Sequence, residues 1–489
     1  MTMDRRRMCW GSGVSRRNLL AASLGVVGTS LLASCGQEAT APLTKPTVSA
    51  GLSAPTATTA AIAPTTVPAA AAEKPPVVAK PVTITVWFPP TGNYTEYLTS
   101  QTALFQQSQD KVKVTVEPSG ATDKLQASIV AGTPPNLQQS NYIPMFLWHA
   151  QGALEPVDQY MDKRGKGDYH DWAREGSTIQ GKFFEWPWML NPTGAVVNRT
   201  LLAERGALAQ MPAQGTTANW TFDQWRKLLQ ASATVTGDVT KDVYGTAFMG
   251  TTTWYWEMMY LWGNGAEIYN SDETKVIVNS PEGIAGLEML LDVQTKDRVA
   301  APGPEGLDAT KAFELFYTKR AALVGGSNAN IGEVDRRIKG GTIIAPFDAA
   351  FIPPPHAPGK RAAAFVAIQS FLVYKQARDT DTTVGAMQFG AFLTDTPAQQ
   401  AITGIGELPV RKSAGNIYAG DPNRTTGFAV IENGRSMGRF PENGEVRVLW
   451  QDAIRAVWTR EKTPKDALND LVRLSEPIMA KNIARGGTR

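Results

Sequence analysis

Two spacings of apolar residues alternate along the chain and predict its regular structure. Residues 82–88 and 112–116 alternate apolar and polar side chains, as half-buried strands do. Each is followed by apolar residues at helical spacing, and the second helical stretch stops at residues 132–134, Gly-Thr-Pro. A third extended stretch, residues 137–142, precedes a helix through Phe146. Strand, helix, strand, helix and strand in this order predict a doubly wound α/β lobe, which binds ligands at the carboxyl ends of its strands.

The end of the chain follows a helical pattern. An amphipathic stripe with the spacing i, i+3, i+4, i+7, i+8 and i+11 is formed by Val446, Leu449, Trp450, Ala453, Ile454 and Val457. A last helix is predicted to begin after Thr463, with Pro464 at its first position and Asp466 at its third. Two consecutive helices are therefore expected at the carboxyl end.

The amino-terminal pattern is that of an export signal. Ser15-Arg16-Arg17-Asn18-Leu19-Leu20 is close to the twin-arginine export consensus, and the alternative is a basic leader for the general export route. The weakly apolar residues 19–33 would rise about 22 Å as a helix, which is too short for a hydrocarbon core of roughly 30 Å. They end in Leu32-Ala33-Ser34-Cys35, which resembles a bacterial lipoprotein box. In such signals the thiol of Cys35 is lipidated, so we expect an exported protein anchored at the outer face of the cytoplasmic membrane, in a periplasm or at the cell surface.

Residues 36–80 differ in composition from the rest of the chain. Ala, Pro and Thr dominate, aromatic residues are absent and no apolar periodicity is present. Such a segment cannot bury enough apolar surface to offset its ordering entropy, so it predicts a disordered tether. As a coil of this length it would reach roughly 35–40 Å, which would hold a globular body just off a membrane.

Composition excludes several classes of function. The net charge is +3 without a basic block, which gives no sign of nucleic-acid binding. After the leader no apolar run reaches 18 residues, so no second membrane segment is expected. Cys9 and Cys35 are the only cysteines, which leaves the exported body without a disulfide. The three histidines lie at no metal-ligand spacing, so we expect no metal.

The sequence offers no convincing catalytic motif. Residues 325–329, Gly-Gly-Ser-Asn-Ala, approximate a nucleophile elbow but lack its final Gly. No phosphate-binding loop of the GxxxxGK[ST] type is present. We therefore expect no catalytic residue and no cofactor.

Eight short segments, taken in order, resemble bacterial extracellular solute-binding proteins of family 1, the substrate-binding lipoproteins of carbohydrate ABC transporters. The resemblance covers about residues 82–475. Its landmarks are Thr85-Val86-Trp87 and residues 124–135, 152–158, 181–187, 196–202, 220–225, 261–267 and 406–411.

The resemblance implies an α/β fold of the type II periplasmic-binding-protein class, with two lobes joined by hinge crossings. Lobe one would comprise residues 82–195 and 345–400, and lobe two residues 196–344 and 401–489. The crossings would fall near residues 194–196, 340–346 and 400–406. Closure around a ligand is then a hinge motion, because the ligand contacts both lobes only in the closed state.

Aromatic residues are the first candidates for ligand binding. A sugar ring stacks its C–H face on an indole, while its hydroxyl groups bind amides and carboxylates at the edge. Clusters of aromatic side chains occur in stretches that indicate loops or strand ends, and the alternative for each is core packing. The candidates are Trp87, Trp186, Trp188, Trp254, Tyr255 and Trp256.

The polar candidates are Gln139, Asn141, Asn328, Glu407 and Arg411. Arg411 lies where the resemblance implies a segment returning to the cleft, and its alternative is a surface ion pair. Two departures from the sugar-binding pattern are present. Residues 325–330, Gly-Gly-Ser-Asn-Ala-Asn, lack the usual aromatic residue, and the usual acid of the third strand is replaced by neutral side chains.

The resemblance therefore implies a monomeric receptor that captures a sugar, oligosaccharide or related polyol and delivers it to the permease subunits of an ABC importer. One alternative is a surface-anchored glycan-degrading enzyme. The other is a binding protein for a non-sugar solute, such as a phosphodiester or a peptide.

Overall fold

The computed structural model describes residues 75–89, 92–119, 122–250, 255–376 and 380–485. The export signal, Cys35, most of the expected tether and Trp254 lie outside these residues. Residues 75–80, which we assigned to the tether, are described and contact the globular body: Val78 is buried and its carbonyl accepts a hydrogen bond from Lys111 Nζ at 3.2 Å. Within the described ranges every helix is too short or too polar to cross a bilayer.

The larger of the two main sheets has seven strands in the order β12, β6, β11, β3, β1, β2, with β13 paired to β11. Their bounds are β1 Val82–Phe88, β2 Val112–Pro118, β3 Leu137–Asn141, β6 Trp186–Pro192, β11 Ala364–Val373, β12 Leu408–Pro409 and β13 Gly434–Arg435. Strand β1 is parallel to β2 and β3, whereas β11 is antiparallel to β3 and β6. Segments from both halves of the chain therefore share this sheet.

The smaller main sheet has the strand order β10, β7, β9, β8. Its strands are β7 Gly194–Asn198, β8 Tyr244–Ala247, β9 Ala321–Gly326 and β10 Ala349–Ile352, and a separate hairpin joins β4 Thr178–Ile179 to β5 Lys182–Phe183. Only Thr193 separates β6 from β7, so the chain passes directly from one sheet to the other. At this crossing a Cβ on Gly194 would lie 2.5 Å from the Phe351 ring, which explains the glycine.

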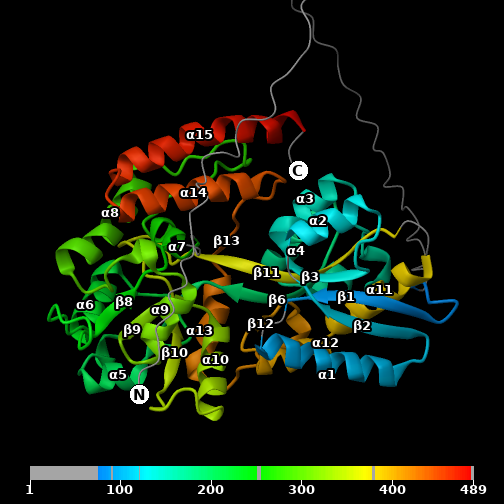
Figure 1. Ribbon diagram of the computed structural model, residues 1–489, viewed down its shortest axis with the longest axis horizontal. Helices are drawn as coiled ribbons and strands as arrows, with labels where there is room; N and C mark the ends of the chain where they lie inside the picture. Colours follow the sequence, from blue (N-terminus) through cyan, green and yellow to red (C-terminus); the bar gives the residue numbers. More distant parts are fainter. Residues whose placement is uncertain (1–74, 90–91, 120–121, 251–254, 377–379, 486–489) are drawn as a thin grey trace, which may run out of the picture. The chain divides into compact units, whose positions relative to one another are not determined.

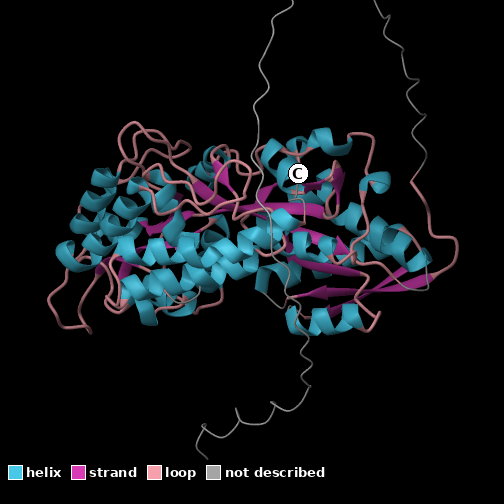
Figure 2. Ribbon diagram, turned by 90° about the horizontal axis from the view of Figure 1, so that it is seen from above, coloured by secondary structure: helices cyan, strands magenta, loops and turns pink. Residues whose placement is uncertain are grey.

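Helices flank the strands of both sheets (Figure 1), and Figure 2 shows them on either side of the strands. They are α1 Gly92–Ser108, α2 Thr122–Val130, α3 Tyr142–Ala150, α4 Asp171–Gly176, α5 Arg199–Glu204, α6 Phe222–Ser232, α7 Tyr255–Gly263, α8 Pro281–Asp292, α9 Ala309–Tyr317, α10 Asn328–Lys339, α11 Thr380–Leu393, α12 Thr396–Ala401, α13 Pro422–Ile431, α14 Asn443–Trp458 and α15 Pro464–Ala484. Helices α14 and α15 lie side by side.

The predicted α/β class with two lobes is confirmed, as is the order of elements from β1 to α3. The last helix begins as predicted, because the Thr463 side chain accepts a hydrogen bond from the Asp466 backbone N–H.

Two expectations about local structure need correction. Tyr255 and Trp256 begin helix α7 and do not lie in a loop, and this helix is buried on every face, so it shows no amphipathic stripe in the sequence. Strand β10 pairs with β7, and β12 pairs with β6, each in the sheet opposite to the one that our lobe bounds imply. Such pairings are non-local, so no sequence pattern near these strands indicates them. The lobe bounds as a whole stay a prediction.

Candidate ligand-binding site

A cavity of about 400 Å³ lies at the carboxyl ends of β1 and β3. Apolar surface comes from helices α2 and α3, including Leu125 and Trp148. Polar surface comes from residues 138–141, which are Gln, Gln, Ser and Asn, and from Gln369 on β11. Pro441, Gly444 and Arg447 complete the lining from the start of α14. This is the edge of a doubly wound sheet where ligands are expected to bind.

Hydrogen bonds fix the amides at the end of β3. Asn141 caps α3, because its Oδ1 accepts a hydrogen bond from the Ile143 N–H at 3.1 Å. Gln139 donates from Nε2 to Gln369 Oε1 at 2.8 Å, across the antiparallel pairing of β3 with β11. Gln138 accepts a hydrogen bond from the Tyr374 hydroxyl at 2.7 Å. The amides are therefore held in place before any ligand arrives.

Of the predicted ligand-binding residues, Gln139 and Asn141 line this cavity, and their contact with a ligand stays a prediction. Trp87 lies nearby at the end of β1 but is buried and is not among the lining residues. Its indole donates to Glu117 Oε2 at 3.0 Å, and Lys124 Nζ lies 4.3 Å from the ring centroid. These contacts hold the indole against β2 and α2.

Trp186 and Trp188 lie on β6 and are fully buried in the core. Trp188 packs with Phe88, Tyr97 and Phe371 at centroid distances of 5.1–6.1 Å. Trp186 packs against α11, where a Cβ on Gly390 would lie 2.3 Å from the indole. The described structure thus places both side chains in the packing role that was the alternative to ligand binding.

Trp256, Asn328 and Glu407 lie where the two sheets meet, away from the lining of the cavity. The Trp256 indole covers Gly325 of β9, and Asn328 Nδ2 donates to the Arg424 carbonyl at 2.8 Å. Tyr255 belongs to the same region through α7, but the structure does not describe its side chain.

Glu407 is a buried carboxyl group that joins the two sheets. Its Oε1 accepts hydrogen bonds from Ser327 Oγ at 3.1 Å and from Asn191 Nδ2 of β6. Burial raises the pKa of Glu407 to about 8, although these two hydrogen bonds lower it. The neutral form of this carboxyl group is therefore favoured near pH 7.

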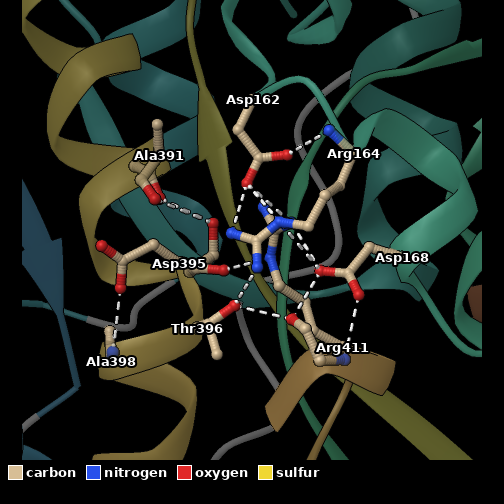
Figure 3. Close-up of polar contacts among 11 residues, drawn as sticks. Asp162, Arg164, Asp168, Ala391, Asp395, Thr396, Ala398 and Arg411 are labelled. Carbon is tan, nitrogen blue, oxygen red and sulfur yellow. Dashed lines mark hydrogen bonds and ion pairs between the residues drawn. The ribbon is translucent and has the colours of Figure 1, made fainter.

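Arg411 is the centre of a buried charge cluster (Figure 3). Its guanidinium lies 3.1 Å from Asp168 Oδ2, donates to the Thr394 carbonyl and stacks 4.7 Å from the centre of the Tyr169 ring. Burial raises the pKa of Asp168, but hydrogen bonds from Ser413 and Arg411 outweigh it and lower the pKa below its usual value. Arg411 thus forms an ion pair, but the expected surface location is wrong, because the side chains of Arg411 and Asp168 are only 2% and 7% exposed.

A larger cavity of about 640 Å³ lies beside the β4–β5 hairpin. Three cations line it, and each already has an acidic partner. The pairs are Lys166 with Asp158, Arg174 with Asp171, and Arg439 with Glu273. Because these charges are satisfied, the cavity beside β3 is the better candidate site. In the described part of the chain no three His, Cys, Asp or Glu side chains come close enough to hold a metal ion.

Most of the residues that line the cavity were not among the candidates from the sequence, and they include Trp148, Gln369 and Arg447. Trp148 and Arg447 lie within helical patterns, where a lining residue has the same periodicity as a core or surface residue. Gln369 is brought to the cavity by the pairing of β11 with β3, more than 200 residues earlier in the chain. No local signal in the sequence indicates that pairing.

A family model described as bacterial extracellular solute-binding protein matches residues 88–400. A protein of Brucella abortus (strain 2308), named only as a binding protein, is 22% identical over 364 residues, 73% of this chain and 83% of its own length. The sn-glycerol-3-phosphate-binding periplasmic protein UgpB of Escherichia coli (strain K12) is 25% identical over 221 residues, 42% of this chain and 47% of its own. The structure of maltose-bound MalE3 from T. maritima matches with a TM-score of 0.69 at 19% identity, over 81% of this chain and 99% of that one. At this identity the structural match is a likeness of fold.

Proposed function

We propose, because this chain belongs to the family of bacterial extracellular solute-binding proteins, that it is the substrate-binding component of an ABC importer. It captures a sugar, oligosaccharide or related polyol and delivers the ligand to the permease subunits. The names of two similar proteins, one a glycerol-phosphate binder and the other solved with maltose, support a polyol as the class of ligand.

The single observation that carries this proposal is the cavity at the end of β3. Its volume of about 400 Å³ lies within the range of small-molecule sites, roughly 300–1,000 Å³. Four side-chain amides line it, and amides exchange hydrogen bonds with hydroxyl groups as both donors and acceptors. Trp148 and Leu125 provide apolar surface for the C–H face of a polyol.

The cavity is also placed for closure. One side comes from β3, β11 and α3, and the other comes from α14, which packs on α15. A ligand that touches both sides would favour the closed form, since it gains contacts only there.

Lipid attachment at Cys35 completes the proposal. A lipidated Cys35 would hold the protein at the outer face of the cytoplasmic membrane, and residues 36–74 would separate that anchor from the globular body. Metabolic labelling with a radioactive fatty acid tests this directly. The label and the membrane fraction should both be lost in Cys35→Ser, and a variant that keeps the label would refute lipidation at this position.

The binding function is tested by incubating the purified protein with a panel of monosaccharides, oligosaccharides and polyols. A ligand should raise the melting temperature by mass action, about 2.7 kcal/mol of stabilisation at a hundredfold excess over Kd, and should be recovered intact. Shortened oligosaccharides would instead support the glycan-degrading enzyme. A response to a phosphodiester or a peptide, without a response to any polyol, would support the non-sugar alternative.

A further inference from the structure

Several amide NH2 groups on the lining of the cavity beside β3 have no hydrogen-bond acceptor in the described part of the chain. The oxygens of Gln138 and Asn141 already accept hydrogen bonds, which leaves the NH2 group of each without a partner among the described residues. The Gln139–Gln369 pair leaves one oxygen and one NH2 group. Three NH2 groups, those of Gln138, Asn141 and Gln369, are thus available to a ligand, alongside the remaining lone pairs of the amide oxygens and the Ser140 hydroxyl.

Arg447 adds a positive charge to this set of donors. Its side chain is exposed, lines the cavity and has no ion pair or hydrogen bond within the part of the chain that the structure describes. Its helical neighbours three and four residues away are Asn443, Gly444, Trp450 and Gln451, none of them acidic. The charge of Arg447 is therefore not neutralised by its own helix.

Nearby acidic residues are engaged elsewhere. Glu442 pairs with Arg485 at 2.6 Å, and Glu445 pairs with Lys481 at 3.2 Å. None of the described residues that line the cavity is a carboxylate. The local charge of the cavity is therefore positive.

We propose that the ligand of this cavity carries an oxyanion, a carboxylate or a phosphate ester on a polyol frame, which pairs with Arg447. The inference rests on the proposed function and adds the charge of the ligand to it. An oxyanion is an acceptor with several lone pairs, so it can accept hydrogen bonds from the guanidinium and from the free amide NH2 groups together. A neutral sugar is a poorer match, because it brings no negative charge to pair with the guanidinium of Arg447.

The test compares each neutral polyol with its anionic forms. Glucose, glucuronate, glucose 6-phosphate, glycerol and glycerol 3-phosphate are titrated by calorimetry into the wild-type protein and into Arg447→Met, Arg447→Lys and Arg455→Met. Arg455 is the matched control, since it is an exposed arginine of the same helix that pairs with Asp452 at 3.3 Å and does not line the cavity. Melting temperatures without ligand confirm that each variant is folded.

We expect an anionic probe to bind more tightly than its neutral form. Arg447→Met should weaken that binding about 10- to 100-fold, Arg447→Lys should weaken it less, and Arg455→Met should leave it unchanged. The glucuronate and phosphate arms show which oxyanion is preferred. Equal binding of the neutral and anionic forms, unaffected by Arg447→Met, would overturn the anionic assignment and leave the proposed function standing. A lack of response to every polyol, neutral or anionic, would overturn both.

Discussion

Arg411 and Arg447 carry the same guanidinium group in opposite surroundings. Arg411 is 2% exposed, and its donors are taken by Asp168, Asp162 and the Thr394 carbonyl. Arg447 is exposed beside the cavity, and none of the residues that the structure describes pairs with it. The two regions therefore use charge differently. In the Arg411 cluster the charges pair with one another and stabilise the contact between distant segments of the chain. In the cavity the polar groups remain available to a ligand.

The charge cluster connects segments that are far apart in the sequence. Asp162 and Asp168 precede the β4–β5 hairpin, and Arg411 follows β12. Ser413 adds a backbone and a hydroxyl hydrogen bond to Asp168. Because both partners of the Asp168–Arg411 pair are buried, removal of one leaves a buried charge with only a longer contact to a more exposed partner, Arg164 for Asp168 and Asp162 for Arg411. This is more costly than the loss of an exposed pair.

The largest effect is expected for Arg411→Met. Methionine keeps much of the apolar bulk but leaves Asp168 with only its longer contact to the more exposed Arg164, whose Nε lies 3.7 Å from Asp168 Oδ2. The free energy of unfolding at pH 7 should therefore fall by about 3 kcal/mol, the lower end of the cost of breaking a buried ion pair. Urea unfolding followed by tryptophan fluorescence measures this change.

The pH dependence of that loss is a control on its cause. The pKa of Asp168 is lowered in the folded protein, so its contribution to stability is present above the pKa of the unfolded chain and is lost as the pH falls through the folded pKa. The difference in the free energy of unfolding between wild type and Arg411→Met should therefore become smaller below about pH 4. A constant difference from pH 3 to pH 7 would mean that lost packing, not lost charge pairing, causes the destabilisation.

Glu407→Gln tests a buried acid that forms no ion pair with any cation in the described part of the chain. Burial raises the pKa of Glu407 to about 8, so the folded state holds a proton that the unfolded state releases above about pH 4.5. Its stability contribution is complete below that pH and is lost as the pH rises through 8. The substituted amide would keep an oxygen to accept from Asn191 and Ser327 without an ionisable group. At pH 5 the free energy of unfolding of the variant should lie within about 1 kcal/mol of the wild-type value. At pH 9 it should exceed the wild-type value by more than about 1 kcal/mol.

Two further buried carboxyl groups affect how that experiment is read. Burial raises the pKa of Glu257 to about 8 and that of Glu185 to about 7, with the same sign as for Glu407. Wild-type stability should therefore fall between pH 5 and pH 9, and Glu407→Gln should remove only part of that slope. A slope identical to wild type would show that Glu407 does not titrate in this range.

Short sequence patterns predicted those strands and helices whose own residues show alternation or a helix cap. Alternation marked β1 and β2, and Asn141 and Thr463 cap the helices that follow them. The cavity was predictable only in part, because Gln139 and Asn141 belong to a strand end recognisable in sequence. Gln369 and Arg447 reach it through long-range packing, which no short window of sequence contains.

Aromatic clusters gave the least reliable guide to the site. Trp186 and Trp188 were candidates because indoles stack on sugars, but indoles fill a core equally well. In the structure both side chains pack against aromatic or small residues of the larger sheet and its helices, such as Phe371 and Gly390. Composition alone does not distinguish the two uses, because the distinction depends on which element covers the strand.

Gln369→Leu should affect binding more than folding, in contrast to Arg411→Met. The variant removes an amide NH2 group from the cavity and the acceptor for Gln139, while Gln139 Nε2 keeps the Ser140 carbonyl at 2.9 Å. Affinity for a bound polyol should fall about tenfold, which is about 1.4 kcal/mol. Calorimetry measures the affinity, and urea unfolding supplies the control on stability. A large loss of stability with unchanged affinity would show that Gln369 stabilises the fold, as the Arg411 cluster does, and does not contribute to ligand binding.

The smallest effect is expected for Lys412→Met, directly beside Arg411. Lys412 pairs with Asp171 at 3.3 Å, but the two side chains are 47% and 69% exposed, so water screens the attraction and solvates either partner when the other is removed. The unfolding midpoint should stay within experimental error of wild type, and raising the salt concentration should not change that result. The loss of unfolding free energy on substitution would then differ between Arg411 and Lys412 because only Arg411 is buried. If Lys412→Met instead destabilised the protein as strongly as Arg411→Met, stability would depend on the net positive charge of the whole segment. Burial of Arg411 would then not explain why it differs from the exposed Arg447.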